Sequence, residues 1–199
     1  MGHRRLCPGG ALSAGLVLAM SAPAAFAGDG WVDEVKLGVL DHDIAFFGDS
    51  VESGVDVNGE VRFHAVDWFA SKDRAAWVND FLSPRPDIGA SVNTSGNTDF
   101  YYAGLAWTWD FASDVVQAKD GLYGDFGFGG AIQDGDLDNA PPGEKAFGSR
   151  GLFHLSGELG YRFNPQISLS VYYEHFSNAG LARPNPGLNN VGMRLGYRF

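Results

Sequence analysis

Apolar and polar side chains alternate along much of the chain beyond residue 30. Apolar residues take every second position in five segments: 35–39, 101–109, 153–163, 167–173 and 191–199. Successive side chains of a β-strand point to opposite faces, so this period of two predicts strands with one apolar and one polar face. Weaker alternation around 61, 88–93 and 122–131 adds three strands. The chain is therefore expected to be all-β, with eight strands.

The eight strands are expected to close into an antiparallel transmembrane β-barrel of the outer membrane. Eight is the smallest common strand number for such barrels, whose apolar residues face lipid and whose polar residues fill the interior. The seven prolines beyond residue 27 fall outside the predicted strands, as a hydrogen-bonded ladder requires. Aromatic residues gather near strand ends, where interfacial girdles form: Trp31, Trp107, Trp109, Tyr161, Tyr173 and Tyr197.

A soluble eight-stranded barrel or sandwich is the alternative fold, and its apolar faces would point inward. Two features favour the membrane barrel. The polar faces carry Gly, Ser, Thr, His, Arg and Glu, which suit a narrow polar interior, and the chain ends in Phe199 within an alternating strand. Beyond the N-terminal segment, no run approaches the roughly 20 apolar residues of a membrane helix. Strands are therefore the expected way of crossing a membrane.

The first 27 residues have the features of a secretory signal peptide. Arg4 and Arg5 precede an apolar stretch at 11–20, and Ala25-Phe26-Ala27 supplies small residues for cleavage. Cleavage after Ala27 would leave residues 28–199 as a single barrel domain. The sole cysteine, Cys7, would leave with the signal peptide, so no disulfide and no cysteine metal site is expected.

The charge of the chain argues against nucleic-acid binding. The formal net charge is -10, and removing Arg4 and Arg5 would make it -12. No basic stripe of the kind that neutralises phosphates occurs along the chain. Its 28 glycines, roughly twice the usual share of about 7%, favour packed sheets and tight turns.

The connections can be assigned to two sides if both termini face the periplasm. Loops at 41–58, 95–97, 133–149 and 178–188 are then extracellular. Residues 71–82 break the alternation and predict a short amphipathic helix on the periplasmic side, with Ser71 as candidate N-cap and apolar pairs at i,i+4 spacing. A plug or cover for the barrel base is the favoured role of this helix, and an interfacial anchor is the alternative.

Polar residues enter the apolar stripe at the end of the segment 167–173. His175 and Ser177 continue its register, and Asn189 continues the register of the last strand. Residues i and i+2 of a strand project side by side, which brings a hydroxyl within reach of an imidazole. The three residues therefore form a candidate catalytic cluster at the upper edge of the bilayer. On spacing alone, a strand that simply ends in water is the favoured explanation, and the catalytic cluster is the alternative.

The other histidines of the domain offer no rival site. His64 and His154 fall in the polar-facing register and are expected to be interior hydrogen-bonding groups, and His42 is expected to be structural. The acidic segment 134–138 begins like a calcium loop, but its sixth and twelfth positions are Asn139 and Lys145 instead of Gly and Glu. A solvated loop is the expected structure, and no metal or cofactor is expected.

Several segments resemble the PagL family of lipid A 3-O-deacylases. The strongest resemblance is in EHFSNAGL, PNPG and GMRLGYRF at 174–181, 184–187 and 192–199, and weaker ones lie at 39–43, 55–61 and 83–86. The resemblance spans nearly the whole chain after the signal peptide. It implies an eight-stranded barrel in the outer membrane of a Gram-negative bacterium. The implied activity is hydrolysis of the ester-linked acyl chain at position 3 of lipid A, within lipopolysaccharide, at a site on the lipid-facing surface.

The resemblance also implies roles for individual residues. Ser177 matches the nucleophile and His175 the general base, while Asn178 and Asn185 match positions associated with the oxyanion environment. Family members with a full triad place Glu fourteen residues after the histidine, where this chain has Asn189. An asparagine can accept a hydrogen bond from the imidazole, but it supplies no negative charge.

Two functional classes follow from that departure. The favoured one is an outer-leaflet esterase with a Ser–His dyad. The histidine of this dyad would be oriented by Asn189 or by a carboxylate elsewhere in the chain. The alternative is a barrel that keeps the fold as a structural or lipid-binding protein with weak or no catalysis. The sequence leaves the oligomeric state open between a monomer and a homodimer.

Overall fold

The computed structural model describes residues 30–46, 48–67, 69, 71–111 and 121–199. The expected signal peptide and its cleavage point lie outside the described residues. The chain folds into eight strands and one short helix: β1 (Val32–Asp41), β2 (Val55–Phe63), α3 (Ala76–Phe81), β3 (Arg85–Asn93), β4 (Phe100–Asp110), β5 (Leu122–Gln133), β6 (Gly151–Arg162), β7 (Ile167–Ser177) and β8 (Leu188–Arg198).

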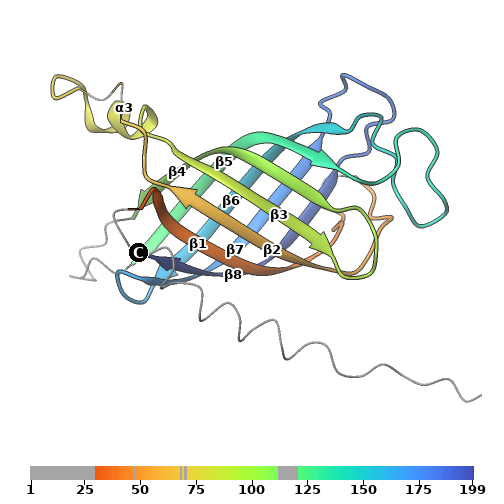
Figure 1. The fold of residues 1–199 in the computed structure, drawn as a ribbon, viewed down its shortest axis with the longest axis horizontal. Helices are drawn as coiled ribbons and strands as arrows, with labels where there is room; N and C mark the ends of the chain where they lie inside the picture. The colour runs from red at the N-terminus through yellow and green to blue at the C-terminus, as the bar shows by residue number, and fades with distance from the viewer. Residues whose placement is uncertain (1–29, 47, 68, 70, 112–120) are drawn as a thin grey trace, which may run out of the picture.

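The strands form a closed antiparallel barrel in which each strand pairs with the next and β1 pairs with β8 (Figure 1). The predicted all-β fold with eight strands is confirmed. Loops 42–54, 94–99, 134–150 and 178–187 project from one end, called the loop end below, and the C-terminus lies at the opposite end. Closure pairs every strand on both sides, so no sheet edge is left open.

The two faces of the barrel wall differ as the alternation predicted. Side chains such as Val39, Leu159 and Met193 are 54–60% exposed on the outer face. Inside, Lys36 Nζ lies 2.9 Å from Asp125 Oδ2. Other interior cations are likewise paired with carboxylates, because unpaired buried charges are costly. An apolar exterior around a polar interior contradicts the soluble alternative.

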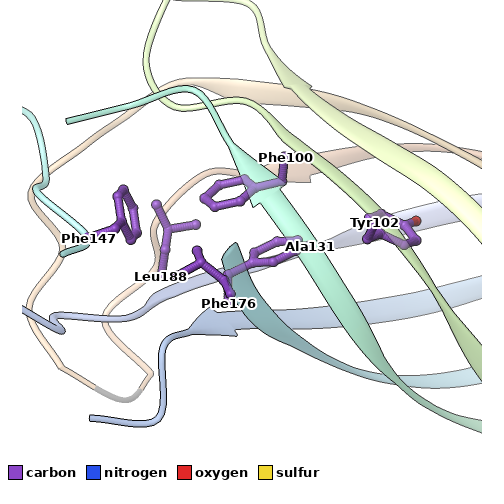
Figure 2. Packing of buried hydrophobic residues seen from close by; sticks show 7 residues of the cluster. Phe100, Tyr102, Ala131, Phe147, Phe176 and Leu188 are labelled. Carbon is purple, nitrogen blue, oxygen red and sulfur yellow. The ribbon is translucent and has the colours of Figure 1, made fainter. Parts of the chain in front are cut away.

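The interior also contains an apolar cluster that the sequence analysis did not predict. Seven buried residues point inward near the loop end (Figure 2): Phe100, Tyr102, Ala131, Phe147, Leu152, Phe176 and Leu188. The rings of Phe100 and Phe176 stack with centroids 4.0 Å apart. Phe147 comes from the loop between β5 and β6, so the cluster fastens that loop over the mouth of the barrel. The site described below lies outside this packed core.

The predicted helix exists, but its start and its position correct the expectation. It begins after Ala75, which makes no side-chain cap, while Ser71 instead exchanges hydrogen bonds with Asn79. The helix projects outward from the rim of the barrel at the end opposite the loop end and does not lie across the opening (Figure 1). Phe81 stacks on the outward-facing Trp107, whose Nε1 donates to the Phe81 carbonyl at 2.8 Å. The plug or cover is therefore wrong, and the outer position fits the interfacial alternative.

Two smaller expectations are corrected and two hold. Pro86 is the second residue of β3 instead of lying outside a strand, a position near a strand start where proline is tolerated. His64 lies beyond β2 with 65% of its side chain exposed, so it is not an interior group. His154 and His42 are buried, as expected. No helix within the described ranges is long and apolar enough to span a membrane.

Candidate active site

His175 and Asn189 face each other across the antiparallel ladder of β7 and β8 on the outer face of the barrel. The imidazole Nδ1 lies 2.8 Å from the side-chain oxygen Oδ1 of Asn189. An amide oxygen only accepts hydrogen bonds, so Nδ1 carries the proton in this contact. The second ring nitrogen, Nε2, is then the unprotonated one and can act as a base.

Ser177 is the last residue of β7 and shares the outer face with His175. It lies opposite Phe153 of β6 and is half-buried. No hydrogen bond joins Ser177 to His175 in the described part of the chain. Two residues of strand rise separate their backbones by about 7 Å, a distance that side-chain rotation can bridge. The structure therefore brings the hydroxyl and the imidazole to one face without pairing them.

Asn189 is almost completely enclosed, with 1% exposure. The hydroxyl of Tyr173 donates to its Oδ1 at 2.7 Å, and its Nδ2 donates to the carbonyl of Ile44 at 3.5 Å. The backbone N–H of Ile44 in turn donates to the carbonyl of Asn189 at 2.7 Å. The first loop thus covers the residue that contacts the imidazole.

Asn178 and Asn185 lie in the loop between β7 and β8 but have different surroundings. The side-chain N–H groups of Asn178 donate to the carbonyls of Phe147 and Pro184, at 2.7 and 3.1 Å. Its backbone N–H donates to Asn185 Oδ1 at 2.9 Å. The Nδ2 group of the exposed Asn185 makes no hydrogen bond within the described residues. Asn178 therefore organises the loop, and Asn185 keeps a free donor.

The same loop ends in a glycine that packs against the imidazole. Gly187 has φ +66°, and a Cβ there would lie 3.0 Å from Cε1 of His175, so only glycine fits without displacement. Its carbonyl accepts a hydrogen bond from Lys145 Nζ at 2.9 Å. The same ammonium pairs with Asp43 at 2.5 Å. Lys145 therefore fixes the backbone that lies over the histidine.

A buried cluster beneath the site joins the loops to one another. His42 lies 2.9 Å from both Asp56 and Glu52, and the Glu52 carboxylate also accepts from the backbone N–H groups of Thr98 and Lys145. Burial alone lowers the pKa of His42, but its hydrogen bonds to the two carboxylates outweigh burial and raise the pKa to about 9. Burial raises the pKa of Glu52, but His42 and the N–H donors lower it overall. The charged cluster therefore links three loops to one another.

An open cavity of about 440 Å³ lies next to the candidate nucleophile, at the loop end of β5 and β6 and against the last loop. Aromatic and aliphatic side chains and glycine backbone dominate its lining: Phe128, Gly129, Gly130, Ser149, Gly151, Leu152, Phe153, Asn178, Leu181 and Ala182. Phe153 is the residue paired with Ser177. An apolar chain placed in this cavity would lie against the ladder partner and the chain neighbour of Ser177.

Sequence reasoning missed three residues of the site. Tyr173 was noted only as a girdle aromatic, although it shares the outward register of His175 two residues on. Lys145 was considered only as a failed calcium ligand, and Gly187 only as part of a motif. No local signal could have paired Lys145 with Gly187, because they lie in different loops. Within the described ranges, no group of three or more His, Cys, Asp or Glu side chains has an arrangement that could hold a metal ion.

Residues 63–198 match the family described as lipid A 3-O-deacylase (PagL). The curated protein "Lipid A deacylase PagL" of Bordetella bronchiseptica (strain ATCC BAA-588 / NCTC 13252 / RB50) is 39% identical over 56 residues, 28% of this chain and 32% of that protein. The aligned part thus spans about a third of that relative's length.

Two solved structures resemble the barrel. The crystal structure of the outer membrane enzyme PagL matches with a TM-score of 0.57 at 19% identity, covering 83% of this chain and 99% of that chain. Neisserial surface protein A matches with a TM-score of 0.47 at 13% identity, covering 83% and 96%. At these identities, the match to the outer membrane enzyme shows a shared fold.

Proposed function

The chain belongs to the lipid A 3-O-deacylase (PagL) family, and from that premise we propose that it hydrolyses the ester-linked acyl chain at position 3 of lipid A. The proposed location is the outer membrane of a Gram-negative bacterium, with the site at the outer leaflet. The contact that carries the proposal is the 2.8 Å bond from His175 Nδ1 to Asn189, with Ser177 on the same outer face.

In the proposed reaction, Nε2 of His175 takes the proton of the Ser177 hydroxyl as its oxygen attacks the ester carbonyl. The tetrahedral intermediate then breaks its bond to the sugar oxygen, which receives the proton from the imidazolium. The products of this half-reaction are an acyl-serine and a free 3-hydroxyl on the glucosamine. A water molecule, deprotonated by His175, attacks the acyl-serine, and release of the fatty acid returns the proton to Ser177.

The negative oxygen of each intermediate needs hydrogen-bond donors. We assign this role to the side-chain Nδ2 of Asn185, whose other end is held by the Asn178 backbone N–H. The side-chain donors of Asn178 are already used on Phe147 and Pro184, so Asn178 is assigned to loop structure. This assignment separates two residues that the family resemblance groups together.

The surroundings of the site suit a lipid ester. The outer wall is apolar, and the cavity beside Ser177 is lined mainly by aromatic, aliphatic and glycine residues. An acyl chain lying along the wall would bring its ester to the loop end, where the polar site begins. A water-soluble ester would gain little from this surface.

The second candidate function is a structural or lipid-binding barrel without catalysis. Two observations favour it: Asn189 occupies the position of the family carboxylate, and Ser177 is not hydrogen-bonded to His175 in the described structure. Both leave the nucleophile less activated than a complete triad would.

Mass spectrometry of lipid A from cells with and without the gene separates the two functions. The proposal expects loss of one 3-hydroxyacyl chain in cells that express the wild type, and no loss with Ser177→Ala. Ser95→Ala, a matched change of an exposed serine in another loop, should behave as the wild type. Unchanged lipid A in cells whose wild-type barrel is folded in the outer membrane would instead support the non-catalytic function.

A further inference from the structure

The residue that contacts His175 has two chemically different ends, which a family glutamate does not have. With Oδ1 of Asn189 toward the imidazole, Nδ1 carries the proton and Nε2 is free to act as base. With the amide turned over, Nδ2 would donate to Nδ1, and the proton would move to Nε2. That tautomer cannot accept a proton from Ser177. A dyad built on asparagine therefore needs the amide orientation to be fixed.

Two contacts fix the orientation of this amide. The Tyr173 hydroxyl donates to Asn189 Oδ1 at 2.7 Å, and the carbonyl of Ile44 lies 3.5 Å from Nδ2. If the amide turned over, its oxygen would face the Ile44 carbonyl oxygen, and two acceptors would oppose each other. The Tyr173 hydroxyl would also have to change from donor to acceptor. Both contacts therefore favour the orientation that leaves His175 Nε2 basic.

Tyr173 is itself well placed to hold this bond. It shares the outer face of β7 with His175, and it lies opposite Val191, two residues after Asn189 on β8. The ring of Phe46, from the first loop, packs against the Tyr173 ring with centroids 5.6 Å apart. The bond to Asn189 is shielded by its surroundings, since Asn189 is 1% exposed, and shielding strengthens a hydrogen bond.

We propose that Tyr173 is a positioning residue, which acts through Asn189 to hold His175 in the tautomer that deprotonates Ser177. The Tyr173–Asn189–His175 chain then performs the orienting part of the role that a carboxylate performs in a full triad. This inference rests on the proposed deacylase function. The proposal predicts that Tyr173 matters only while residue 189 carries an amide. A carboxylate at position 189 has two accepting oxygens and no wrong orientation, so the histidine should then no longer need Tyr173.

A double-mutant cycle tests the proposal with purified, full-length variants in detergent. Tyr173→Phe should lower kcat for lipid A deacylation about 10-fold, or roughly 1.4 kcal/mol, and change KM less than about 2-fold. In an Asn189→Glu background, Tyr173→Phe should change kcat less than about 2-fold. Tyr101→Phe is the matched control, because Tyr101 also lies on the outer face near the loop end, and it should behave as the wild type.

Nitrogen-15 NMR of His175 tests the same proposal without relying on activity. The wild type should show the proton on Nδ1, and Tyr173→Phe should show a mixture of both tautomers, with unchanged heat-dependent gel mobility of the barrel. If the wild type did not deacylate lipid A, the proposed function would fail while this spectrum still decided the role of Tyr173. An unchanged tautomer in Tyr173→Phe, or equal loss of kcat in both backgrounds, would overturn the positioning role.

Discussion

Neighbouring residues on the two faces of β7 differ in how fully their side chains are hydrogen-bonded. Glu174 points inward, is 0% exposed, and accepts hydrogen bonds from Ser91 at 2.6 Å and Asn190 at 2.9 Å. His175 points outward and is held through one ring nitrogen by Asn189. Its other nitrogen makes no hydrogen bond within the described residues. The inner group is fully used by the fold, and the outer group retains a free base.

The next two residues of the strand repeat the contrast. Phe176 is 0% exposed and stacks on Phe100 inside the barrel, whereas Ser177 is half-buried outside, and its hydroxyl makes no hydrogen bond in the described structure. A strand whose inward side chains are bonded or packed, as Glu174 and Phe176 are, can hold the outward groups between them in fixed positions. Catalytic constellations need such support, because small displacements reduce their rates.

The largest effect should come from removing the outer groups. Ser177→Ala and His175→Ala are each expected to lower deacylation at least about 10³-fold, and the double variant should be no worse than either, since the two act as one unit. Release of 3-hydroxy fatty acid from lipid A measures the rate. Heat-dependent gel mobility should be unchanged, because neither side chain packs inside the barrel. Multiplicative losses in the double variant would show independent roles.

Removing an inner group should affect stability instead. Phe176→Ala should lower the free energy of unfolding by about 3–5 kcal/mol, because it opens a cavity in the apolar cluster at the loop end. Urea unfolding in detergent measures the loss. Val171→Ala, on the outer face of the same strand and 53% exposed, is the control and should cost much less. Equal losses would mean that the two faces do not differ in packing.

The charged cluster around His42 should make the stability of the protein fall at high pH. The pKa of His42 is about 9 in the folded state and about 6.5 in the unfolded state. The stabilisation that this histidine contributes is therefore complete below about pH 6.5 and is lost as pH rises through 9. The full effect is about 3 kcal/mol. Unfolding free energies between pH 6 and 10 measure it, with His42→Gln as the control. An identical pH slope in His42→Gln would exclude this histidine as the cause.

The smallest predicted effect concerns the departure from the family. Asn189→Glu should raise deacylation about 10-fold, roughly 1.4 kcal/mol, because a carboxylate stabilises the imidazolium that forms during attack. Asn189→Leu should lower activity, since it removes the acceptor for His175 Nδ1. Rates of the three proteins are compared in one detergent. If the three rates were equal, Asn189 would not orient the histidine, and a carboxylate elsewhere near the loop end would be the next candidate for that role.

The amino-acid pattern alone was enough to predict the strands, their two faces and the placement of His175 and Ser177 on the outer one. Each of these follows from a period of two within a single strand, so it needs no knowledge of other segments. The outward position of Asn189 follows from the alternation of the last strand in the same way, whereas its fourteen-residue spacing from His175 was taken from the family resemblance. The interior position of His154 was predicted correctly from the same alternation. The same prediction was wrong for His64, because β2 ends before this residue.

The distant groups that support the site could be identified only from the folded barrel. Closure of the barrel brings the first and third loops onto the hairpin of β7 and β8, so that Lys145 reaches Gly187 and Ile44 reaches Asn189. Such contacts join residues about 40 to 145 positions apart, and alternation within one strand carries no information about them. The apolar cluster inside the loop end escaped prediction for the same reason: inward residues of separate strands become neighbours only when the sheet closes on itself.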